Sequence, residues 1–341
     1  MLGIYGVFAA IVLRPLLWVM LRSHALLVWI FRNKETRFFT YLSGNYAPVT
    51  REIYTSKLPL LHGYLPADLD GMYVRNGPNP DVKGAKPGFY HWFDGEGMLH
   101  GVRIEGGEAS YCNHQMVTEQ VVAERALGMN VVPRIGDLKG RLGLFKIIVY
   151  ELFRSVGALP KELSSKGSGP VNTSVVFHDR RLLALAEGSP SPFHVHVHSD
   201  GRMEDVGGFN YEGQLANAIS AHPKIDPETH EMMWVGYDAI KPVAFHTVVT
   251  GHGDLRPVLE VPLRHPTMMH DTAITKNYTL ILDFPVFFDV RALASGGEAF
   301  YFDEQAGSRI GLLPRHARHA SDAVWFQCKS GFMMHSGCAW E

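Results

Sequence analysis

The sequence is poor in cysteine. Three residues, Cys112, Cys328 and Cys338, stand far apart and form no C-x-x-C pair. This odd, scattered set argues against a disulfide framework and against a zinc knuckle. An excess of one charge is also lacking, because 32 basic and 34 acidic residues leave a formal charge of −2. Without a basic field or an acidic tail, we expect no nucleic-acid partner.

The sequence also lacks an uninterrupted apolar run of about 20 residues, the length that crosses a membrane. Residues 1–34 come nearest, with no acidic side chain, but the arginine-containing segments 14–15 and 22–24 divide their apolar runs. Arginine at mid-membrane depth is costly. Three interpretations stay open: a targeting segment, an imperfect anchor, and an interfacial helix whose arginines reach the headgroups. We therefore expect residues 1–38 to be an apolar, basic leader of a membrane-associated protein, either a membrane anchor or a targeting segment. The organelle, plastid or endomembrane, does not follow from it.

Turn residues are abundant, with 34 glycines and 20 prolines spread along the chain. Asp-Gly and Gly-Gly pairs at 70–71, 94–95, 106–107 and 200–201 are bounded by alternating or fully apolar runs, as in β-hairpins. From about residue 40 onward the pattern therefore predicts an all-β domain. The strongest strand predictions are residues 72–74, 99–104, 182–186, 232–236 and 279–284.

One stretch breaks the β pattern. Residues 137–156 carry apolar side chains at helical spacing, with basic side chains between them. We predict a helix here, within a helical insertion near residues 118–165. It either packs on the domain or also touches a membrane through its apolar face. The apolar positions are Leu142, Phe145, Ile148, Val149, Leu152 and Val156.

Histidine is unusually frequent, with 18 residues, and three of them share a local pattern. The tripeptide Met-Met-His ends at His270 and again at His335, 65 positions later, and His222 lies 48 positions before His270. These separations are near one β-propeller blade of roughly 40–50 residues plus an insertion, and the inner strands of such blades line a central axis. Spacing alone leaves two interpretations open: a shared metal site, or ordinary core and turn residues. The alternating His194, His196 and His198 are not expected to bind metal.

Taken in order, the motifs resemble those of the carotenoid cleavage dioxygenases, especially the plant-type enzymes. The resemblance extends over residues 40–341 with few gaps. The segments that carry it are 43–49 (SGNYAPV), 73–80 (YVRNGPNP), 90–101 (YHWFDGEGMLHG), 172–173 (NT), 183–187 (LALAE), 221–227 (AHPKIDP), 269–275 (MHDTAIT), 309–315 (RIGLLPR), 325–326 (WF), and His335 with 339–341 (AWE).

The resemblance implies a seven-bladed β-propeller with a helical cap and an axial Fe(II) held by four histidines. By motif, His222, His270 and His335 correspond to the first three ligands. Glu187, 35 residues before His222, corresponds to a carboxylate that holds a ligand ring. The fourth histidine of the family lies downstream of the third motif. We therefore expect residues 39–341 to be a partial propeller domain of about four to five blades, inactive as it stands.

The family's reaction is the cleavage of a C=C bond of a carotenoid or apocarotenoid by O₂, which gives two carbonyl products. We expect 9,10-type cleavage and a substrate drawn from a membrane surface. A stilbene-cleaving or isomerising member is an alternative within the family. A metal-dependent hydrolase on a propeller, holding zinc or calcium, and a non-catalytic lipid-binding propeller are alternatives outside it. Two departures from the family pattern, Thr272 and Met334, leave the substrate open.

Overall fold

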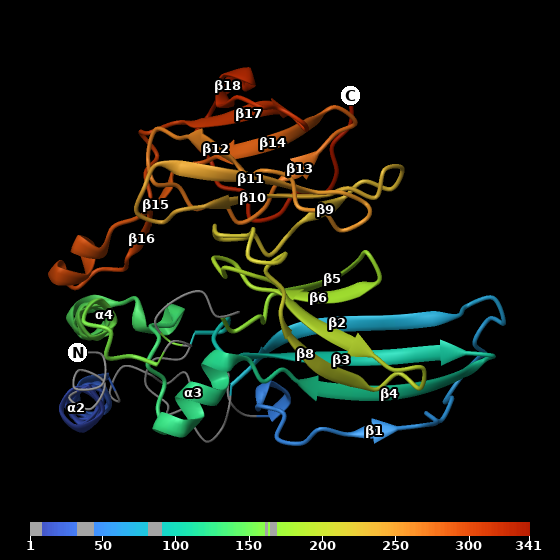
Figure 1. Cartoon of the computed structure of the whole chain (residues 1–341), viewed down its shortest axis with the longest axis horizontal. Helices are drawn as coiled ribbons and strands as arrows, with labels where there is room; N and C mark the ends of the chain where they lie inside the picture. Colours follow the sequence, from blue (N-terminus) through green and yellow to red (C-terminus); the bar gives the residue numbers. More distant parts are fainter. Residues whose placement is uncertain (1–8, 33–43, 81–90, 161–162, 164–168) are drawn as a thin grey trace.

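The computed structural model describes residues 9–32, 44–80, 91–160, 163 and 169–341. These residues form four four-stranded antiparallel sheets and one two-stranded sheet, joined mainly by tight turns. In Figure 1 the first two four-stranded sheets lie in the lower half and the other two in the upper half, with the helices at the lower left. The expectation of a mainly β domain is confirmed.

Within each sheet the strands are antiparallel, and most pairs join strands that are consecutive in sequence. The first sheet contains β2 (Gly71–Asn79), β3 (Glu96–Glu105), β4 (Glu108–Gln115) and β1 (Tyr54–Thr55), and the second contains β5 (Ser174–His178), β6 (Arg181–Leu185), β7 (Phe193–Val197) and β8 (Met203–Gly208). The third contains β9 (Lys224–Ile225), β10 (Met232–Tyr237), β11 (Val243–Val249) and β12 (Leu259–Pro262). The fourth contains β13 (Ala273–Ile274), β14 (Tyr278–Asp283), β17 (Ser308–Pro314) and β18 (Val324–Cys328). All five predicted strands are present, as β2, β3, β6, β10 and β14.

Packing between the sheets explains why the sequences of β6 and β10 are continuous apolar runs. Successive side chains of a strand point to opposite faces. On β6, Leu182 packs toward the first sheet, whereas Leu183 packs toward the third. On β10, Trp234 packs toward the second sheet and Val235 toward the fourth. Both faces of these sheets are therefore buried, and the sheets stack face to face.

Helices α3 (Glu119–Leu127) and α4 (Gly140–Ser155) follow the first sheet, within the predicted insertion. Thr118 caps α3 by accepting a hydrogen bond from the Val121 N–H, and Gly128 ends it in the left-handed conformation. The predicted helix at 137–156 is confirmed as α4. One polar position differs from a simple amphipathic pattern, because Lys146 is buried and forms an ion pair with Asp137.

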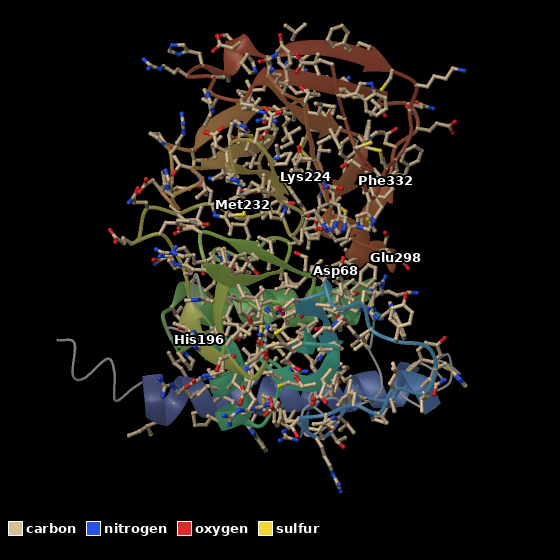
Figure 2. The ribbon with its side chains drawn as sticks, turned by 90° about the vertical axis from the view of Figure 1, so that its right-hand side faces the viewer. Asp68, His196, Lys224, Met232, Glu298 and Phe332 are labelled. Carbon is tan, nitrogen blue, oxygen red and sulfur yellow. The ribbon has the colours of Figure 1, made fainter. Side chains whose placement is uncertain are left out.

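The described part of the leader forms a π-helical turn, η1 (Ala9–Leu13), followed by helix α2 (Arg14–Arg32). Leu17 and Leu21 of α2 pack against Val149 and Phe153 of α4. Figure 2 shows α2 lying along the lower edge of the molecule. Among the described residues, no helix is both long and apolar enough to span a membrane.

A two-stranded arm, β15 (Val286–Phe288) and β16 (Phe300–Phe302), leaves the fourth sheet between β14 and β17 and reaches the helices (Figure 1). Its tip carries the 3₁₀ turn η5 (Val290–Ser295). There, the Gly140 N–H donates to the Gly297 carbonyl at 2.9 Å, and Arg141 Nε donates to the Ala294 carbonyl at 3.0 Å. The arm thus fastens the start of α4 to the fourth sheet.

Candidate metal centre

Three histidines approach one point from three different places in the chain. His222 lies two residues before β9, and His270 lies three residues before β13. His335 follows β18, in a segment without regular secondary structure. Since β9 and β13 are edge strands of neighbouring sheets, the sheet packing brings their entrances together. The structure therefore assembles the three histidines that the sequence pattern singled out.

The contacts between the rings are made by the Nε2 atoms. Nε2 of His270 is 3.0 Å from Nε2 of His222 and 3.2 Å from Nε2 of His335. The ligand atoms of the three side chains all lie within 4.8 Å of one another, and no other group of three potential metal-ligating side chains is found in the described part of the chain. His222 and His270 are half-buried, and His335 is exposed.

This cluster fits a divalent transition-metal ion. With metal–imidazole bonds of about 2.0–2.1 Å, two adjacent nitrogen ligands stand roughly 2.9 Å apart around an octahedral ion and roughly 3.4 Å apart around a tetrahedral one. The two Nε2–Nε2 distances, 3.0 and 3.2 Å, fall between these values. Imidazole suits iron, zinc, copper and nickel. Burial, followed by the neighbouring His270, lowers the pKa of His222 to about 4, so this ring is neutral and offers a lone pair at neutral pH.

Glu187 holds the ring of His270 from behind. One carboxylate oxygen, Oε2, is hydrogen-bonded to Nδ1 of His270, and the other, Oε1, accepts a hydrogen bond from the hydroxyl of Tyr237. A proton on Nδ1 leaves the lone pair of His270 on Nε2, the atom that faces the other two rings. Glu187 was expected from its motif, whereas Tyr237, the last residue of β10, was not. Its only signal in the sequence is its position directly after a predicted strand.

Further hydrogen bonds join the three segments. Ser220 Oγ accepts from the His222 N–H at 3.1 Å and donates to the His270 carbonyl at 3.2 Å. Asp271 is 3% exposed and forms an ion pair with Lys224 at 2.8 Å. Burial by itself would raise the pKa of Asp271, but hydrogen bonds from Lys224 and from backbone amides lower it, so the carboxylate stays ionised.

The alternating histidines of β7 form no comparable group among the described residues. His198 is hydrogen-bonded to Glu204, and the ring of His196 packs edge-on against that of His198. Thr272, which departs from the family pattern, is fully buried, and its hydroxyl donates to the Leu280 carbonyl of β14 at 2.7 Å. It therefore stabilises the sheet that carries His270.

Comparison with known sequences identifies relatives of the whole β region. Residues 46–341 match the family described as retinal pigment epithelial membrane protein. A carotenoid 9,10(9′,10′)-cleavage dioxygenase of Phaseolus vulgaris is 37% identical over 302 residues, 88% of this chain and 54% of the relative. A chloroplastic 9-cis-epoxycarotenoid dioxygenase of Arabidopsis thaliana is 33% identical over 311 residues, 90% of this chain and 53% of the relative. The chain thus spans about half the length of the curated relatives it matches.

Solved structures show the same fold. A lignostilbene dioxygenase of Pseudomonas brassicacearum superposes with a TM-score of 0.68 at 25% identity, covering 84% of this chain and 55% of that one. A cobalt-substituted Synechocystis ACO gives a TM-score of 0.63 at 22% identity, with coverages of 84% and 58%. Because the family match extends over most of the chain, this protein belongs to the family of the retinal pigment epithelial membrane protein and the carotenoid cleavage dioxygenases.

Proposed function

We propose that this protein is a non-haem iron(II) dioxygenase that cleaves a C=C bond of a carotenoid or apocarotenoid. The observation that carries the proposal is the convergence of His222, His270 and His335 from three separate segments. Membership of the carotenoid oxygenase family supports it. Three Nε2 atoms that face one another where two sheets meet are expected for metal ligands, because a bound cation would be shared by their lone pairs.

In this proposal the three imidazoles bind iron through Nε2, and Glu187 orients His270. When bound, iron(II) would supply the activation of dioxygen. The carboxylate of Glu187 keeps the proton of His270 on Nδ1, and Tyr237 fixes the carboxylate by donating to its second oxygen. Neutral imidazoles leave the full charge on the metal.

The proposed reaction inserts both atoms of O₂. The C=C bond and the O–O bond break, two C=O bonds form, and the two products together contain every atom of the substrate and of O₂. The electrons come from the alkene, so no reducing cosubstrate is required. The protein would hold the metal and the double bond of the polyene at a fixed distance and orientation.

The 9,10 position is the proposed cleavage site, supported by the name of the Phaseolus vulgaris relative. A stilbene substrate is the alternative, supported by the lignostilbene dioxygenase of the same fold. Incubation of the protein with β-carotene, an apocarotenal and a hydroxylated stilbene, followed by mass spectrometry of the products, distinguishes them. Aldehydes or ketones from 9,10 cleavage support the proposal, whereas carbonyl products from the stilbene alone contradict it.

We further propose that the four four-stranded sheets are blades of the family's seven-bladed propeller. The face-to-face stacking of the sheets supports this, as does the placement of β9 and β13 at neighbouring edges. The axis of such a propeller would pass beside the histidine cluster. A histidine from another blade would then complete the iron site.

A membrane surface is the proposed source of the substrate. Helix α2 buries Leu17 and Leu21 against α4, yet the rest of its surface is also mostly apolar. Its exposed side carries Leu16, Val19 and Leu26, the last 56% exposed. Two adjoining helices with exposed apolar rows, the second on α4 at Ile148 and Leu152, are typical of docking to a lipid interface. A plastid membrane agrees with the chloroplastic relative.

Metal content and oxygen uptake test the catalytic proposal, measured on purified protein that contains this sequence. We expect near-stoichiometric iron and carotenoid-dependent uptake, both lost in His270→Ala. His196→Ala, a change of the same type at an exposed histidine outside the cluster, should leave both intact. Bound zinc or calcium without oxygen uptake would favour the hydrolase. A protein that binds carotenoid without metal or turnover would favour the lipid carrier.

Flotation with liposomes tests the membrane proposal. We expect Leu16→Glu combined with Leu26→Glu to reduce the bound fraction, because a buried carboxylate is costly at the lipid interface. Phe177→Glu is the control, since Phe177 is also an exposed apolar side chain and lies on β5 rather than on a helix. Equal loss of binding in the control, or no loss in the double variant, would contradict docking through α2.

A further inference from the structure

Asp271 is a buried carboxylate beside the histidine cluster whose partners come from three different segments. Lys224 Nζ lies 2.8 Å from its Oδ1 and 3.1 Å from its Oδ2, and Oδ1 also accepts from the Thr272 N–H at 2.7 Å. Its Oδ2 accepts from the Ser336 N–H at 2.7 Å and from the Ser336 hydroxyl at 3.1 Å. All of these partners are protein groups, and Asp271 itself is not one of the clustered ligands.

Each partner is a close neighbour in sequence of a different histidine. Lys224 lies two residues after His222, and Ser336 directly follows His335. Asp271 itself directly follows His270. One carboxylate therefore joins the three segments that carry the three imidazoles. Figure 2 labels Lys224, at the start of β9, and Phe332, in the segment leading to His335, in the same half of the molecule.

This junction holds the segment of His335 directly beside the imidazole, and Glu341, which accepts from Asn277, holds the same segment further along. This segment follows β18 without belonging to any β-ladder, and the His335 side chain is exposed. Ser336 Oγ also lies 2.6 Å from the Thr272 carbonyl oxygen, so its single proton is donated either to that carbonyl or to Asp271, while the Ser336 N–H donates to Asp271. Ser220 also links His222 to His270, but its hydrogen bonds among the described residues do not extend to the His335 segment.

We propose that Asp271 is a positioning residue that sets the mutual placement of His222, His270 and His335, and through it the metal affinity of the site. This inference rests on the proposed function, in which the three histidines bind the metal. Asp271 acts through the backbone of the ligand segments, whereas Glu187 acts through a hydrogen bond to a ligand ring. The two residues therefore control different properties: placement of three rings, and the tautomer of one.

The first test is Asp271→Asn, measured as metal affinity by competition with a chelator. The amide keeps the shape of the side chain, but its NH₂ group cannot accept a hydrogen bond. At the Oδ1 position it would face Lys224 and the Thr272 N–H, and at the Oδ2 position it would face Lys224 and Ser336. In either placement the contact with Lys224 is weakened and one backbone N–H loses its acceptor. Changes of this kind outside the ligands typically weaken metal affinity by about 10- to 100-fold. We expect a loss at the lower end of that range, together with a changed absorption spectrum of the cobalt-loaded protein.

The matched control is Asp283→Asn. Asp283 is also 3% exposed and lies on β14; it pairs with Arg309 and accepts from the Thr267 hydroxyl, and neither partner is adjacent in sequence to a clustered histidine. It should lower thermal stability as Asp271→Asn does, yet leave the chelator competition and the cobalt spectrum unchanged. Lys224→Met should reproduce the affinity loss, and the double variant with Asp271→Asn should lose no more than the larger single effect.

The outcomes distinguish failure of the proposed function from failure of the positioning role of Asp271. If the unmodified protein binds neither iron nor cobalt, the proposed function fails, and the inference fails with it. If the unmodified protein binds metal and Asp271→Asn binds it equally tightly, with the same cobalt spectrum, the proposed function stands and the positioning role is wrong. Equal affinity losses in Asp271→Asn and Asp283→Asn would reduce the effect to general destabilisation and also overturn the inference.

Discussion

Replacement of Glu187 by glutamine perturbs one hydrogen-bond acceptor and leaves the size of the side chain unchanged. In the structure, Oε2 faces Nδ1 of His270 and Oε1 accepts from the Tyr237 hydroxyl. A glutamine has one acceptor oxygen, so its NH₂ group must face either the imidazole or the phenol. If it faces the imidazole, the proton of His270 has to move to Nε2, the atom through which we propose that it binds metal.

Loss of such a partner typically weakens metal affinity by about 10- to 100-fold, equivalent to roughly 1.4–2.8 kcal/mol. Chelator competition with the iron- or cobalt-loaded protein measures this directly. Tyr237→Phe serves as the companion variant, because it removes one hydrogen bond but keeps the carboxylate, and we expect a smaller loss. Unchanged affinity in Glu187→Gln, with the fold intact, would refute the tautomer argument.

Two further predictions concern stability. Hydrogen bonds from the Thr229 amide and then from Arg315 lower the pKa of Asp226 to about 2. Its ionisation therefore contributes about 2 kcal/mol to the free energy of unfolding at neutral pH, and this contribution is lost as the pH falls through the folded pKa. The difference in free energy of unfolding between the unmodified protein and Asp226→Asn, measured by urea denaturation, should shrink by about 1 kcal/mol from pH 6 to pH 3. In Gly236→Ala, the new Cβ would lie 2.0 Å from the Ala218 carbonyl oxygen, and thermal unfolding should show a loss of roughly 1–3 kcal/mol.

Each stability prediction has an internal check. A gap between the unmodified protein and Asp226→Asn that stays constant across this pH range would show that the carboxylate is not held ionised by its partners. For the glycine, Gly77→Ala on β2 is the matched control, because no atom lies within 4 Å of the position its Cβ would take. Equal effects of the two alanine substitutions would contradict the close approach of the chain at β10.

The sequence was most informative where one local rule determines the structure. Strand β6 was predictable because four consecutive apolar residues have both faces covered by neighbouring sheets. Helix α4 was predictable from its spacing, but the burial of Lys146 was not. Asp137, which the prediction placed at the start of the helix, lies in a 3₁₀ turn before α4 and forms the ion pair that allows the burial. Repetition along the chain singled out His270 and His335, and the family resemblance supplied the chemistry.

Residues whose partners are remote in sequence escaped prediction. Tyr237 meets Glu187 only because the second and third sheets pack together. Asp271 belongs to one of the motifs that carry the family resemblance, but its contact with Ser336 depends on the return of the chain after β18. Periodicity describes one element at a time, whereas these contacts depend on how several elements meet. The arm formed by β15 and β16 escaped for the same reason, since α4 holds its tip.

Most strands pair with neighbours in sequence, whereas the histidine cluster needs residues from two sheets, and this difference predicts an order of folding. Most strand pairs within the four-stranded sheets join consecutive antiparallel strands, so these contacts close short loops and form early; the pairs β1–β4 and β14–β17 are the long-range exceptions. The imidazoles of His222 and His270 come from different sheets, 48 residues apart, and can meet only after both sheets have formed. A metal that recognises the completed cluster would stabilise the docking of the sheets rather than their formation. Withdrawal of the metal should therefore speed amide exchange first at β9 and β13, while the ladders of β10 and β14 stay protected.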